Sequence, residues 1–167
     1  MKNPLKAQLD QAFAAAERIA LLGCGSHLRG DDAAGVVIVE ALEDLNGTQG
    51  VKTVQIFNGD VAPENQTGGI KEFKPDLVLL IDAVDMDAEP GTARLISSDK
   101  IKCDGVSFSS HMMPMAILID YLIRETGCSV MLLGIQAKSL DFMAELTPAV
   151  ATTVKTLITN LQEALTA

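Results

Sequence analysis

The sequence contains a small set of acidic and imidazole side chains that could bind a divalent metal ion together. Asp31 and Asp32 end a glycine-rich turn, and Asp82 follows an apolar run. His111 stands just before a segment with a helical pattern. One imidazole and two carboxylates, with water in the remaining positions, suit a transition ion such as nickel or zinc. These residues can form one site only if the fold brings them to one place.

The glycine-rich turn links an apolar, strand-like run to the start of a helical pattern. Such a helix start often binds phosphate in nucleotide-binding proteins. Here Asp31 and Asp32 would repel phosphate and attract a cation. Gly23 and Gly25 match the first two glycines of the dinucleotide-binding fingerprint, but Leu28 stands where the third glycine belongs. The turn therefore favours a cation site over a nucleotide site, with simple helix capping by the two aspartates as the alternative.

Asp82 comes directly after the apolar run Val78 to Ile81. A carboxylate at the end of a buried strand is costly unless it binds a metal, accepts hydrogen bonds or opens into a cleft. Hydrogen bonds from loop amides are the alternative explanation for Asp82. His111 could equally be a solvated loop histidine, and His27 could be a second ligand or a gate residue.

Nucleophilic catalysis has little support in the sequence. Ser109, Ser110 and Cys103 are available, but no Gly-x-Ser-x-Gly elbow is present. The residues therefore favour metal binding over catalysis by a protein nucleophile.

Helical and strand-like patterns alternate along the chain, which predicts an α/β three-layer sandwich with a mostly parallel, five-stranded twisted sheet. In such a sheet, ligands bind beyond the carboxyl ends of the strands, where the strand order reverses. Asp31, Asp32 and Asp82 would reach that edge, and the loop carrying His111 could return to it. We expect strands at 18–23, 51–57, 77–81, 92–96 and 130–135, helices at 3–17, 32–45, 115–124 and 147–165, a short helix ending near 73, and a polar loop at 98–112.

Composition narrows the classes of function. The 167 residues suit a single domain, 1–167, with a helix at 1–17 preceding a core at 18–167. A net charge of −9 argues against binding nucleic acid or an anionic membrane surface. The odd number of cysteines, three, favours a reducing cytoplasm. No apolar stretch approaches the roughly 20 residues that a membrane span requires, so we expect no membrane insertion.

Several short motifs resemble those of the hydrogenase maturation endopeptidases, most closely the type that serves hydrogenase 3 of formate hydrogenlyase. The motifs occur in the family's order between about residues 19 and 165. They are Gly25-x-x-x-x-Gly30-Asp31-Asp32-x-x-Gly35, Ala62-Pro63-Glu64-Asn65, Ile81-Asp82-Ala83-x-Asp85-Met86, Pro90-Gly91, Ser110-His111-x-Met113-Pro114, Leu133-Gly134-Ile135-Gln136 and Leu146-Thr147-Pro148.

This resemblance implies an endopeptidase that removes the C-terminal extension of a [NiFe] hydrogenase large-subunit precursor after nickel insertion. The family's metal-binding and catalytic positions fall on Asp32, Asp82 and His111. Nickel would be supplied by, or shared with, the precursor, and zinc or cadmium could replace it in crystals. The roles of Asp31, His27 and Asp85 stay open. A nickel chaperone, or a checkpoint that binds the precursor without cutting it, is the alternative function.

The sequence also departs from the family at two positions near the predicted site. The family usually has Gly-Asn in the first turn, where this chain has Gly25-Ser26. An aspartate is common after the second strand, where this chain has Asn58, with Asp60 two residues later. These differences affect the surroundings of the three predicted ligands rather than the ligands themselves.

Overall fold

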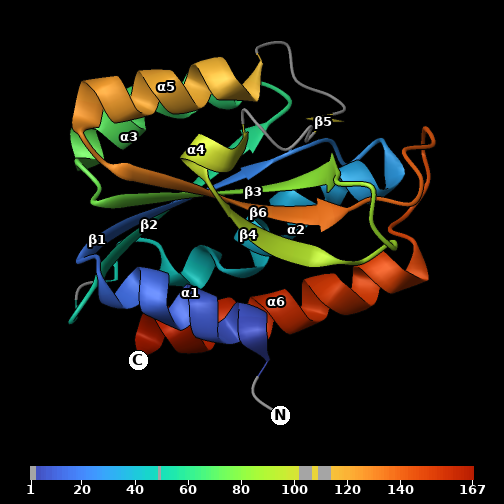
Figure 1. Cartoon of the computed structure of the whole chain (residues 1–167), viewed down its shortest axis with the longest axis horizontal. Coiled ribbons are helices and arrows are strands. Elements are labelled where there is room, and N and C mark those ends of the chain that lie inside the picture. The colour runs from blue at the N-terminus through green and yellow to red at the C-terminus, as the bar shows by residue number, and fades with distance from the viewer. Residues whose placement is uncertain (1–2, 49, 102–106, 109–113) are drawn as a thin grey trace.

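The computed structural model describes residues 3–48, 50–101, 107–108 and 114–167. It has three layers, with helices on both faces of a central sheet (Figure 1). The strands are β1 (Arg18–Cys24), β2 (Thr53–Asp60), β3 (Leu77–Asp85), β4 (Ala93–Ser97), β5 (Ser107–Phe108) and β6 (Ser129–Gln136). The helices are α1 (Pro4–Ala14), α2 (Ala34–Ala41), α3 (Thr67–Phe73), α4 (Ser98–Ile101), α5 (Met115–Thr126) and α6 (Pro148–Thr166), with 3-10 turns at Gly30–Ala33, Glu43–Leu45 and Pro63–Gln66.

The five main strands lie in the order β2-β1-β3-β6-β4. The first four of these are parallel to one another, and β4 runs antiparallel to β6 at the edge. The short β5 pairs antiparallel with the end of β3. The α/β class and the mostly parallel sheet predicted from the sequence are therefore confirmed.

Alternate side chains of each strand face two separate hydrophobic clusters, because successive residues of a strand point to opposite faces. Leu21 and Leu79 face a cluster formed with α1, α2 and α6. Leu22 and Leu80 face a second cluster, formed with α3 and α5. Figure 1 shows α1 and α6 below the sheet and α3 and α5 above it. No helix in the described ranges is long and apolar enough to span a membrane.

Several expected elements have other bounds in the structure; the strand expected at 51–57, for example, is Thr53–Asp60. The predicted strand at 77–81 extends to Asp85, so Asp82 lies within β3 rather than after it. The predicted helix at 32–45 is divided into a 3-10 turn, α2 and a second 3-10 turn. The predicted polar loop at 98–112 contains α4 and the short strand β5.

Candidate active site

The carboxyl ends of β1 and β3 separate at the point where the strand order reverses. The last paired residues of these strands are Gly23 and Ile81. Gly35, in the first turn of α2, lies just beyond this pair. A Cβ atom added to Gly35 would lie 2.1 Å from the carbonyl oxygen of Ile81 and 2.5 Å from that of Cys24. Only a glycine therefore lets α2 approach both strand ends this closely.

Asp32 lies in the 3-10 turn that precedes α2 and is fully buried. Its Oδ2 atom accepts a hydrogen bond of 3.0 Å from the backbone N–H of Ser26. Gly25 has a φ of +129°, and a Cβ atom there would lie 1.8 Å from the carbonyl oxygen of Asp32. The glycine turn thus folds back tightly over Asp32 and fixes the direction of its carboxylate. The N-cap residues of this turn and of α2 are Arg29 and Ala33, so Asp32 occupies neither cap position.

Asp82 is also fully buried, one residue beyond the last β1–β3 pair. The alternation along β3 directs its side chain to the face that carries α3 and α5, where the side chain of Cys24 also lies. Burial and the charges of Asp82, Asp32 and Glu64 raise the pKa of the Cys24 thiol well above its usual value. Asp32 and Asp82, predicted to meet at this edge, therefore lie within electrostatic reach of the same sulfur atom.

The raised pKa of the Cys24 thiol leads to a prediction about its reactivity. A thiol that stays protonated and buried is a poor nucleophile. We expect iodoacetamide at pH 8 to leave Cys24 unmodified in the folded protein and to modify it in urea, as measured by peptide mass mapping. Rapid modification of Cys24 in the folded state would contradict this description of the thiol.

Asp31 has a different role from its neighbour Asp32. It is fully buried, and its carboxylate accepts hydrogen bonds from the backbone N–H groups of Lys138, Ser139 and Thr147 at 2.7–3.1 Å. The Thr147 hydroxyl donates to the same carboxylate. In return, the N–H of Asp31 donates to the carbonyl oxygen of Ser139. Asp31 therefore holds the segment between β6 and α6 against the glycine turn, and it is not the N-cap residue of that turn or of α2.

The other residues left open by the sequence lie around this centre. His27 is exposed, and its Nε2 atom lies 2.8 Å from Oε1 of Glu40. Asp85 is exposed, and its Oδ1 atom accepts hydrogen bonds from the N–H of Asp87 and the side-chain amide of Gln136.

Several sequence predictions fall outside the described residues. They concern His111, Ser109, Ser110 and Cys103. Within the described ranges, no three histidine, cysteine or acidic side chains are arranged to hold one metal ion. Asp32 and Asp82 are thus brought to one edge as a buried acidic pair, and the imidazole ligand stays a prediction.

Sequence reasoning assigned no chemistry to two further residues near this edge. Glu64 lies in the 3-10 turn after β2, and its Oε2 atom is buried. Gln136, at the end of β6, is buried, and its side-chain oxygen accepts hydrogen bonds from the N–H groups of Met86 and Ala88. The signal for Glu64 was its place in the Ala62-Pro63-Glu64-Asn65 motif directly after a strand that ends at the same edge.

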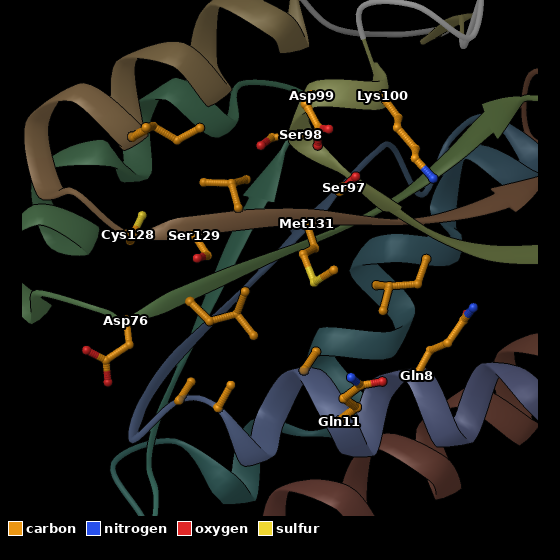
Figure 2. A pocket seen from close by; sticks show the side chains of 17 residues that line it. Gln8, Gln11, Asp76, Ser97, Ser98, Asp99, Lys100, Cys128, Ser129 and Met131 are labelled. Atoms are coloured by element: carbon orange, nitrogen blue, oxygen red, sulfur yellow. The ribbon is translucent and has the colours of Figure 1, made fainter.

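A broad hollow of about 780 Å³ lies elsewhere on the molecule. Figure 2 shows side chains from α1, such as Gln11, on one side of it, and Ser97 and Asp99 on the other. Leu77 and Ser129, which begin β3 and β6, also line it. The hollow is therefore at the amino ends of the parallel strands, opposite the edge where ligands of such sheets bind.

Comparisons with known proteins agree on one family. The family model of HycI, a hydrogenase maturation protease, matches residues 36–164. The hydrogenase 3 maturation protease of Escherichia coli K12 is 33% identical over 142 residues, which cover 85% of this chain and 87% of that protein.

Solved structures show the same likeness. The crystal structure of the [NiFe] hydrogenase maturation protease HycI from Thermococcus kodakarensis KOD1 superposes with a TM-score of 0.85 at 32% identity, covering 96% of this chain and 99% of that chain. For the solution structure of the endopeptidase HycI from Escherichia coli, the TM-score is 0.73 at 32% identity, with 87% and 90% covered. Since the family model covers most of the chain and the relatives match nearly their whole length, this protein belongs to the HycI family of hydrogenase maturation proteases.

Proposed function

We propose that this protein is the endopeptidase that removes the C-terminal extension of a [NiFe] hydrogenase large-subunit precursor once nickel has been inserted. Membership of the HycI family supports the reaction class. The observation that carries the proposal is the buried pair Asp32 and Asp82 at the ligand-binding edge of the sheet. We propose the cytoplasm as its place of action, in keeping with the unpaired cysteines Cys24 and Cys128.

The acidic pair fits a divalent cation. Two fully buried carboxylates are costly to bring together unless a positive charge compensates them. Asp32, Asp82 and His111 would hold nickel that arrives with the precursor, and zinc or cadmium could take its place in crystals. The ion, when bound, would act as a Lewis acid on the scissile carbonyl.

The chain's own residues prepare this site before the substrate arrives. The N–H of Ser26 keeps Asp32 in one orientation, and the β3 strand fixes Asp82. Gly35 lets α2 pack directly against both strand ends. Such a preset arrangement lets the carboxylates engage a cation without first reorganising, which is how a site reduces the cost of binding.

The experiment that tests this function compares nickel-loaded with nickel-free precursor, each mixed with this protein. We expect the intact mass of the nickel-loaded precursor to fall by the mass of its C-terminal extension, and that of the nickel-free precursor to stay unchanged. Binding without any loss of mass would instead identify a chaperone or checkpoint. Cleavage of nickel-free precursor would contradict recognition through the metal.

A further inference from the structure

Glu64 comes from a different part of the chain but lies near Cys24, as Asp32 and Asp82 do. It follows Pro63 in a 3-10 turn just after β2. A Cβ atom added to Gly59 would lie 2.9 Å from Cβ of Pro63 and 3.0 Å from the carbonyl oxygen of Gly23. The turn that carries Glu64 therefore packs against the end of β1, next to Cys24.

A hydrogen bond holds the backbone at Glu64 in place, but one of its carboxylate oxygens has no hydrogen-bond partner among the described residues. The Thr67 hydroxyl donates a hydrogen bond of 2.8 Å to the carbonyl oxygen of Glu64. The Oε2 atom of Glu64 is buried, and no residue in the described ranges hydrogen-bonds to it. Leaving a buried polar atom without a partner costs free energy, and more so for a charged group. Such an atom requires an explanation beyond packing.

The surroundings of Glu64 favour a cation as that explanation. The charges of Asp82, Asp32 and Glu64 all act on the buried Cys24 thiol, so the three carboxylates share its neighbourhood. Like charges at close range oppose one another and stabilise a cation among them. The described residues do not place three ligating side chains around one ion, which argues against Glu64 as a direct ligand in this arrangement.

We propose that Glu64 is a positioning residue of the cation site, whose buried Oε2 atom accepts a hydrogen bond from a water in the hydration shell of the divalent ion held by Asp32 and Asp82. The inference rests on the proposed function, because it assumes that the acidic pair binds a divalent ion. Groups that support metal ligands in this way orient the coordination sphere and raise metal affinity.

The test is calorimetric titration of Ni²⁺ into the whole protein and its variants. Glu64→Gln preserves the size of the side chain but removes its charge, and we expect the affinity to fall about 10- to 100-fold. Glu72→Gln is the matched control, because Glu72 is exposed on the neighbouring α3, and it should bind like the wild type. Wild-type affinity in Glu64→Gln would overturn the inference.

Asp32→Asn separates this inference from the proposed function. If Asp32→Asn loses affinity and Glu64→Gln does not, the acidic site stands and only the role of Glu64 fails. If the wild type and Asp32→Asn bind Ni²⁺ equally well, or the wild type binds none, the acidic pair does not hold the ion in the free protein and the inference about Glu64 fails, while the proposed cleavage is decided separately by the mass of the nickel-loaded precursor.

The Tm measured in the presence of a chelator gives a second readout. It should change in opposite directions for a positioning role and for a purely structural role of Glu64. Without a cation, Glu64→Gln removes repulsion among buried carboxylates, so we expect its Tm to equal or exceed that of the wild type. A carboxylate that only supports the fold would lower the Tm when replaced. A lower Tm for Glu64→Gln, with Glu72→Gln unchanged, would overturn the inference whatever the affinity.

Discussion

Cleavage of nickel-loaded precursor is expected to fall by more than about 100-fold when Asp82 or Asp32 is replaced by asparagine, because groups that merely support metal ligands already contribute about 10- to 100-fold. Asparagine keeps nearly the same shape but lacks the negative charge that would hold the cation. Both side chains are fully buried and close to other acids, so removing one charge relieves repulsion. We therefore expect the Tm of each variant to stay level or rise while activity is lost.

The measurement is the rate at which the extension disappears from the intact mass of the precursor, alongside thermal unfolding of each variant. Asp87→Asn is the control, since Asp87 is exposed just past the end of β3 and has a φ of +53° that asparagine tolerates. Near-normal cleavage by both Asp32→Asn and Asp82→Asn would remove the acidic pair from the mechanism.

Asp31→Ala is expected to cause a large loss of stability, unlike the asparagine variants of Asp32 and Asp82. The substitution leaves three buried or partly buried backbone N–H groups without the acceptor they share. Leaving a buried donor unsatisfied costs about 1–3 kcal/mol. The free energy of unfolding should fall by that amount, and the segment between β6 and α6 should lose protection first.

Urea unfolding measures the stability change, and amide hydrogen exchange locates it. Asp141→Ala provides the control, because Asp141 is exposed in the same segment and only its backbone N–H takes part in a hydrogen bond there. A loss below about 1 kcal/mol for Asp31→Ala, as typical of exposed positions, would mean that other contacts hold this segment.

The positions of Asp32 and Asp82 could be predicted because they follow from local patterns. Asp32 ends the glycine-rich turn that follows one apolar run, Asp82 directly follows another, and parallel strands end at one edge. The same reasoning applies to Glu64, since it lies in the turn that follows β2, which ends at the same edge. The local pattern does not single out Glu64, because a turn that begins with a proline indicates the start of a helix more strongly than a buried acid.

The role of Asp31 could not be predicted from the sequence. Its partners are 107 to 116 residues away, and no local pattern distinguishes it from Asp32. The division of the expected helix at 32–45 has a similar cause. The 3-10 turn at Gly30–Ala33 is tied down by contacts from Asp31 to the distant segment, which local helix propensity does not include. The participation of His111 stays a prediction.

The close approach at Gly35 has a consequence for the choice among metals. The backbone of α2 packs against the carbonyl oxygens of Ile81 and Cys24. The carboxylates of Asp32 and Asp82 therefore have little freedom to move apart or closer together. A rigid metal site discriminates between ions by their radius and preferred number of ligands, whereas a flexible site adapts to each ion. Large, weakly directional ions such as Ca²⁺ should therefore compete poorly here with smaller transition ions.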